Sequence, residues 1–208
     1  MTTTSLPPVR LAGRAALVTL LAVVLAVSLG IVVVGTVDLV LQIANGTAFI
    51  PLRGQPEALA FTFPGPGGVV THGSETVIVS AITGLSAGTT AISTAAGAAG
   101  ILTWVVVGLA VLTLLRGIRT RRAFVRGVVH QVTVAGIVIL ALGTAAQLLG
   151  WWAANAALDE LTDANNEWAY VRDFEFQPLT VAVGLTLLLT GLAFRAGERL
   201  QRDAEGLI

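Results

Sequence analysis

The residues best suited to chemistry in this 208-residue chain are Asp38 and Gln42. They stand one helical turn apart near the end of a long apolar run, where an ionisable side chain is a candidate proton or cation relay. Gln147, in a later apolar run, is the third candidate intramembrane polar residue. A count of about 20 residues from Ala15, however, places Asp38 close to the outer end of a membrane span. The alternative is therefore structural: Asp38 is a hydrated interfacial acid or the partner of an arginine, and Gln147 forms a hydrogen bond between helices.

Other catalytic chemistry has no support in the sequence. The chain has no cysteine, which excludes thiol catalysis, disulfides and iron–sulfur clusters. The nucleophile-elbow, zinc-protease, phosphate-loop and dinucleotide patterns are all missing. The acidic segment 154–177 lacks the spacing of a calcium-binding loop. We therefore expect no enzyme activity, no catalytic residue, no metal and no cofactor.

Arginine supplies all twelve basic residues, and ten of the twelve fall in three places. Two precede residue 15, five lie between residues 116 and 126, and three follow residue 194. Phe124 is the only aromatic residue in the segment 116–126, which holds the central five arginines. Direct nucleic-acid binding needs aromatic side chains on which bases can stack, so it is not expected. Contact with anionic lipid and docking of a cytoplasmic protein are the two remaining interpretations. The eight candidate docking residues are Arg116, Arg119, Arg121, Arg122, Arg126, Arg195, Arg199 and Arg202.

Four apolar runs must position these residues. With 55% hydrophobic and 12% charged residues and a mean hydropathy of +0.85, the chain is expected to be an integral membrane protein that contacts the lipid bilayer. We predict an all-α fold with four transmembrane helices. Their expected ranges are about 15–43, 97–115, 127–153 and 178–195.

The arginines predict the sidedness of these helices, because basic residues next to spans stay in the cytoplasm. The hairpin 116–126, the tail 195–208 and both termini are therefore expected inside. Segments 44–96 and 154–177, which hold Arg53 and Arg172, are expected to be extracytoplasmic. The absence of lysine, together with abundant Ala, Gly, Val and Leu, is typical of a high-GC bacterial genome, so the expected location is a bacterial plasma membrane.

Segment 44–96 is expected to contain β structure. Runs rich in β-forming residues at 58–63 and 76–83 flank a Pro-Gly-Pro-Gly-Gly turn at 64–68. We predict a β-hairpin or two-stranded ribbon that needs support from the helix ends, because a lone hairpin is marginal in water. Residues 85–100 are small and polar enough to extend the second helix outward.

Glycines recur every seven residues in the third and fourth helices, which places them on one face of each. Small residues let helices approach closely in lipid. These glycines either pack helices within one chain or form a seam, for gating or between two copies of the chain. The residues are Gly136, Gly143 and Gly150 in the third helix, and Gly184 and Gly191 in the fourth.

The C-terminal stretch resembles a known family. It reads F-x-F…PL, then an apolar helix, then F-R-x-G-x-x-L-x-x-D-x-E-G, and so is similar to the end of bacterial membrane proteins grouped as domain-of-unknown-function family 2975. That resemblance implies four transmembrane helices and a cytoplasmic helix-turn-helix regulator as partner, and it carries over no catalytic residue. The matching residues are Phe174, Phe176, Pro178, Leu179, Phe194, Arg195, Gly197, Leu200, Asp203, Glu205 and Gly206.

Together these features predict a non-enzymatic sensor or regulatory component. Segments 44–96 and 154–177 would sense the envelope or lipid state, and the hairpin 116–126 and tail 195–208 would hold or release the regulator. The alternative is a small transporter, channel or efflux accessory subunit. Its polar path would be lined by Asp38, Gln42, Thr133, Thr144 and Gln147.

Overall fold

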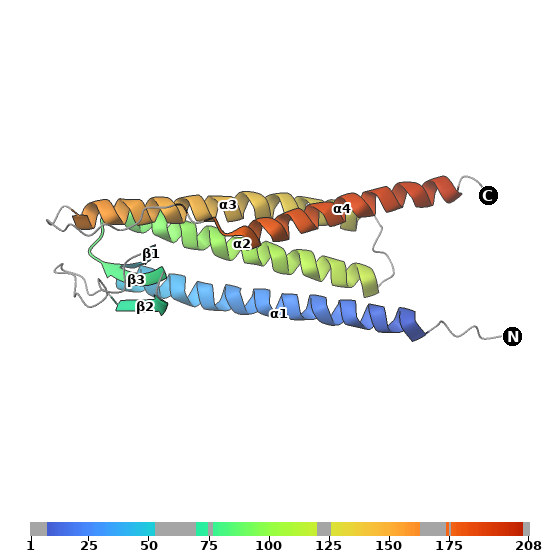
Figure 1. Ribbon diagram of the computed structural model, residues 1–208, viewed down its shortest axis with the longest axis horizontal. Coiled ribbons are helices and arrows are strands. Elements are labelled where there is room, and N and C mark those ends of the chain that lie inside the picture. Colours follow the sequence, from blue (N-terminus) through green and yellow to red (C-terminus); the bar gives the residue numbers. More distant parts are fainter. Residues whose placement is uncertain are drawn as a thin grey trace. The chain divides into compact units, whose positions relative to one another are not determined.

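The structure is a computed structural model that describes residues 8–52, 70–74, 77–119, 126–162, 174 and 176–205. Four of its helices are long and apolar enough to cross a membrane, as the sequence predicted. Figure 1 shows the order of the elements along the chain. They are α1 (Pro8–Asn45), β1 (Thr47–Leu52), β2 (Val70–Ser74), β3 (Val77–Thr83), α2 (Ala87–Arg119), α3 (Arg126–Thr162) and α4 (Pro178–Glu205).

The helices extend past the apolar runs that predicted them. α2 begins at Ala87, which confirms the predicted outward extension of the second helix by residues 85–100, and α3 continues to Thr162 and not only to about residue 153. Residues 154–162 of the predicted second outer loop are therefore helical. Both extensions are rich in alanine, the strongest helix former. The hydroxyls of Thr90 and Thr94 donate to carbonyls one turn earlier, so these polar side chains are satisfied within α2.

Contacts divide the chain into two compact units, each of which contains part of all four helices. We name them by content. The arginine-rich unit comprises Met1–Val32, Thr103–Leu140 and Ala182–Ile208. The sheet unit comprises Val33–Leu102 and Ala141–Val181.

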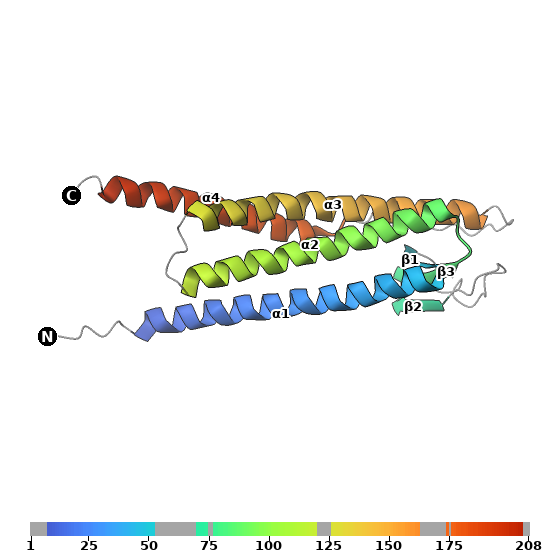
Figure 2. The same cartoon turned by 180° about the vertical axis from the view of Figure 1, so that it is seen from behind.

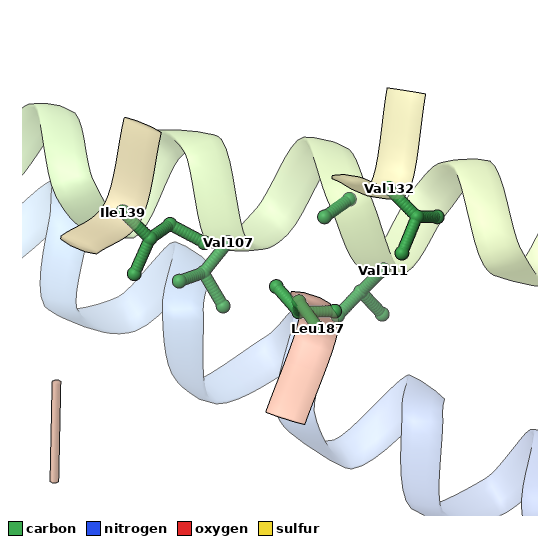
Figure 3. Close-up of a cluster of buried hydrophobic side chains, with 6 residues drawn as sticks. Val107, Val111, Val132, Ile139 and Leu187 are labelled. Atoms are coloured by element: carbon green, nitrogen blue, oxygen red, sulfur yellow. The ribbon is translucent and has the colours of Figure 1, made fainter. Parts of the chain in front are cut away.

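The core of the arginine-rich unit is an aliphatic cluster from α2, α3 and α4. Val132 and Ile139 of α3 are fully buried at its centre. Figure 3 shows these two side chains directed toward those of Val107, Val111 and Leu187. Since lipid tails are as apolar as these residues, close packing stabilises such a core more than removal from water does. The six buried members are Val107, Ala110, Val111, Val132, Ile139 and Leu187.

In the same unit, α3 and α4 approach so closely that only glycine fits at their contact. A Cβ atom added to Gly136 would lie 3.0 Å from the carbonyl oxygen of Gly184 and 3.0 Å from the backbone nitrogen of Leu188. Gly184 faces Leu140, and Gly191 faces Thr133. Residue numbers rise along α3 as they fall along α4, so the two helices are antiparallel.

The glycines predicted to share one face of α3 or α4 do not all lie at the contact between these two helices. Gly136, Gly184 and Gly191 pack helices within the chain, and Gly143 is buried. A Cβ added to Gly150, in the sheet unit, would meet nothing within 4 Å. Packing within one chain therefore accounts for the three glycines at the contact of α3 with α4, and Gly150 does not belong to that contact.

Glycines also join α1 to α2. In the sheet unit, a Cβ on Gly35 would lie 3.1 Å from the Ile101 side chain, and one on Gly97 would lie 3.3 Å from that of Leu39. Ile101 of α2 thus packs on Gly35 of α1, and Leu39 of α1 packs on Gly97 of α2. Figure 2 shows α1 and α2 side by side.

The sheet unit carries an antiparallel sheet of three strands in the order β1-β3-β2. β3 matches the predicted strand at 76–83, and the predicted strand at 58–63 lies outside the described residues. The prediction of a two-stranded ribbon missed both β2 and β1, and the pairing of β1 with β3 runs from Thr47 with Thr83 to Leu52 with Ile78. Pro51 argues against a central strand, but β1 is a terminal strand of the described sheet, where proline is tolerated.

The sheet is supported by α3. Ala48 of β1, Ile82 of β3 and Ala157 of α3 form a buried cluster, with Ala154 and Leu85 packed against it. This contact supplies the helix support that a small sheet needs to be stable.

Candidate functional site

Charge is separated between the two units. The arginine-rich unit holds ten arginines and three acidic residues, which gives its side chains a formal charge of +7. The sheet unit holds two arginines and nine acidic residues, which gives −7. The chain as a whole is neutral, so composition alone conceals this separation.

The structure places the candidate docking arginines mainly at helix ends. Arg116 lies in the last turn of α2, where a cation interacts favourably with the helix dipole, and Arg119 is the last residue of that helix. Arg126 is the first residue of α3. The Arg116 and Arg195 side chains are exposed. In α4 the backbone is helical through Arg195, Arg199 and Arg202, whereas Arg121 and Arg122 lie outside the described residues.

The polar residues of the predicted transport path are not brought together by the described contacts. Asp38 is on an exposed face of α1, and Gln42 is half-buried one turn later. Thr133 belongs to the arginine-rich unit, and its hydroxyl donates to the Val129 carbonyl. Thr144 is exposed. These positions do not favour the transporter alternative.

Gln147 has a structural partner at the start of α4. Its Oε1 accepts a hydrogen bond from the Gln177 backbone N–H at 3.0 Å, and its Nε2 donates to the Gln177 carbonyl at 3.4 Å. Gln177 directly precedes Pro178, which suits the first position of a helix because that position needs no N–H donor. The Gln147 side chain thus binds the backbone where α4 begins.

Glu160 is the polar residue whose role the sequence analysis missed. It lies near the end of α3, and its carboxylate accepts hydrogen bonds at the N-terminus of α2. Oε2 accepts from the Ser86 backbone N–H at 2.7 Å, and Oε1 accepts from the Ser86 hydroxyl at 2.6 Å and from the Thr89 hydroxyl. The Ser86 hydroxyl also accepts from the Thr89 N–H at 3.2 Å, as an N-cap residue does. We name these three residues the α2 cap.

The environment of the cap changes the acidity of its carboxyl group. Burial raises the pKa of Glu160, but the hydrogen bonds from Ser86 and Thr89 together outweigh it, so the pKa is lowered from 4.5. The ionised form also places negative charge at a helix N-terminus, where the macrodipole stabilises it. The α2 cap is therefore a charged structural link between α2 and α3.

Comparison of the chain with protein-family models, curated proteins and solved structures found no match. The resemblance of the C-terminal stretch to a bacterial membrane family therefore stays a prediction. Among the residues that the structure describes, no three His, Asp or Glu side chains are grouped so that they could hold a metal ion.

Replacing Glu160 by glutamine is expected to destabilise the folded protein by about 1 kcal/mol at neutral pH, because the hydrogen bonds from Ser86 and Thr89 lose their charged acceptor. It should also flatten the dependence of stability on acid. Because the folded pKa lies below 4.5, the ionised carboxylate stabilises the protein above that pH. That contribution is lost as the pH falls through the folded pKa.

Thermal unfolding of the purified protein in detergent, at neutral pH and on acidification, measures both effects. The matched control is a double-mutant cycle with Ser86→Ala. If Glu160 acts through the cap, the two substitutions together should cost less than the sum of their separate effects. Strictly additive effects would show that Glu160 stabilises the protein by another route.

Proposed function

We propose that this chain is a non-enzymatic regulatory protein of a bacterial plasma membrane. The arginine-rich unit would face the cytoplasm, and the sheet unit would face the exterior. One observation supports this most: two units of opposite formal charge, +7 and −7, are built from the same four membrane-length helices. Arginine-bearing helix ends are retained in the cytoplasm during insertion, which favours this orientation.

The contacts within the sheet unit support a sensing role for it. The sheet packs on Ala157 of α3, and the α2 cap ties α3 to α2. A ligand or lipid state that displaced the sheet would therefore act on both helices. These helices continue to Arg119 and Arg126, which flank the basic hairpin. A signal would travel along two continuous helices whose ends border the proposed docking surface.

The partner proposed for that surface is a small cytoplasmic helix-turn-helix regulator with an acidic face. Its identity as a helix-turn-helix protein rests on the resemblance of the C-terminal stretch. Its acidic face follows from electrostatic complementarity with the arginine-rich unit, whose formal charge is +7. DNA binding would then belong to the partner and not to this chain.

Cross-linking in membranes followed by capture of the tagged chain tests the proposal. Changing Arg195, Arg199 and Arg202 together to glutamine should reduce recovery of the cytoplasmic regulator at least about tenfold, which corresponds to about 1.4 kcal/mol of binding free energy. The matched control changes Arg53 and Arg172 to glutamine, since these arginines belong to the sheet unit, and it should leave recovery unchanged.

A second arm removes residues 195–208. If the wild-type chain, the truncated chain and the triple variant all recover the same cytoplasmic proteins, docking on the tail is excluded. Equal losses in the triple variant and in the Arg53 and Arg172 control would show that total charge matters and that position does not.

A further inference from the structure

Four exposed aromatic side chains of the sheet unit lie on α3 and immediately before α4. The exposed fractions are 42% for Trp151, 58% for Trp152, 42% for Phe174 and 53% for Phe176. The rings of Trp151 and Phe174 meet edge to face, with centroids 6.2 Å apart and an interplanar angle of 86°. We name these four residues the aromatic collar. Exposed tryptophans with an apolar body and a polar N–H favour the headgroup layer of a membrane.

The exposed backbone beside the aromatic collar limits how deep the collar can lie in the membrane. Phe174, Phe176 and Gln177 are exposed and not helical. Exposed irregular backbone does not occur in the hydrocarbon layer, because its polar groups would lack partners. Gln147 satisfies the backbone N–H and carbonyl of Gln177 immediately before α4. The hydrocarbon boundary therefore lies at or below the start of α4, whose apolar section Pro178–Gly197 has the 20 residues that one crossing needs.

Contacts between the helices show which residues of α2 and α1 lie at the same depth as the aromatic collar. Antiparallel helices rise by the same distance per residue. Thr89 of α2 donates a hydrogen bond to Glu160 of α3, so these two residues lie at the same level. Ala98 is as far from Thr89 along α2 as Trp151 is from Glu160 along α3, so Ala98 lies at the level of Trp151. Its neighbour Gly97 contacts Leu39 of α1. Asp38, the only acid of α1, is thus level with the collar, where a charge is hydrated.

We infer that the aromatic collar lies in the headgroup layer of the outer lipid leaflet. The first turns of α2 (residues 87–97), the last turns of α3 (residues 153–162) and the sheet then stand in water, with the helices projecting about 15 Å beyond the collar. This rests on the proposed function only for the choice of leaflet. The depth follows from the collar, the exposed backbone and the helix contacts.

The sequence offers a clean test because it has no cysteine. Ala91 and Ala95 are exposed on the part of α2 inferred to stand in water, and Leu109, 58% exposed, lies on the part inferred to face lipid. Single variants Ala91→Cys, Ala95→Cys and Leu109→Cys are treated with a membrane-impermeant maleimide in intact cells and in inside-out vesicles. The first two should react at least about tenfold faster than the third, as expected for water-exposed against lipid-covered thiols.

The outcomes separate the inference from the proposed function. Reaction of Ala91→Cys and Ala95→Cys in intact cells supports both. Reaction only in inside-out vesicles supports the collar depth and overturns the sidedness. If the two variants react in neither preparation, yet react fully after denaturation, the inferred depth is wrong.

Tryptophan fluorescence gives a second measurement in vesicles of phosphatidylcholine and phosphatidylglycerol. The variant Trp104→Phe with Trp168→Phe retains only Trp151 and Trp152. Lipids brominated near the headgroup should quench this emission more strongly than lipids brominated deep in the acyl chains. Stronger quenching by the deep bromines would overturn the inference.

Discussion

Replacing Gly136 by valine is expected to destabilise the folded chain by about 3 kcal/mol, at the upper end of what overpacking usually costs. The first added carbon would meet the Gly184 carbonyl oxygen and the Leu188 backbone nitrogen, both at 3.0 Å. Backbone atoms cannot rotate aside as a flexible side chain can. α3 and α4 must therefore separate locally to admit the new side chain. Thermal unfolding in detergent, followed by light scattering, measures the loss.

Gly150→Val is the matched control on the same helix. An added Cβ there meets nothing within 4 Å, so the expected change is within about 0.5 kcal/mol, as for most substitutions away from a packed contact. Equal destabilisation by the two variants would mean that valine perturbs α3 itself, and the close contact with α4 would then not explain the Gly136 result.

Replacing Ile139 by alanine is expected to cost about 2 kcal/mol, the low end of the range for removing a buried aliphatic side chain. Ile139 is fully buried in the cluster of α2, α3 and α4. The low end applies because lipid tails are themselves apolar, so little transfer free energy is lost. The remaining cost is that of the cavity and of the lost contacts with neighbouring side chains.

Ile137→Ala removes the same atoms two positions away, from a side chain that is 55% exposed. Unfolding temperatures of both variants should be compared under one detergent condition. We expect less than about 0.5 kcal/mol for Ile137→Ala. If it destabilises the protein as much as Ile139→Ala does, burial in the cluster is not the source of the loss.

The sequence was sufficient to locate the four long helices, because a segment that crosses a membrane must be apolar along about 20 residues. It located their ends only in part. The outward extension of the second helix by residues 85–100 was predicted, and α2 begins at Ala87, whereas the alanine-rich continuation of α3 to Thr162 has no apolar signature and was not predicted. β1 was missed for a related reason: Pro51 breaks the strand pattern, and only the sheet order shows that β1 is a terminal strand.

The α2 cap could be predicted only in part. Ser86 before an alanine-rich helix is a recognisable N-cap signal. Its carboxylate partner stands 74 residues away in the sequence, within an acidic segment in which Glu160 has no distinguishing neighbour. Likewise, the seven-residue spacing predicted a common face for Gly136 and Gly150, but only the contacts show that the first touches α4 and the second does not.

The glycine contacts join helices that are consecutive in the chain, α1 with α2 and α3 with α4. This order suits synthesis, in which segments leave the translocon one after another. Both members of the first antiparallel pair therefore leave the ribosome before α3 does. For each helix in these contacts, the next or the previous helix to be inserted is its packing partner.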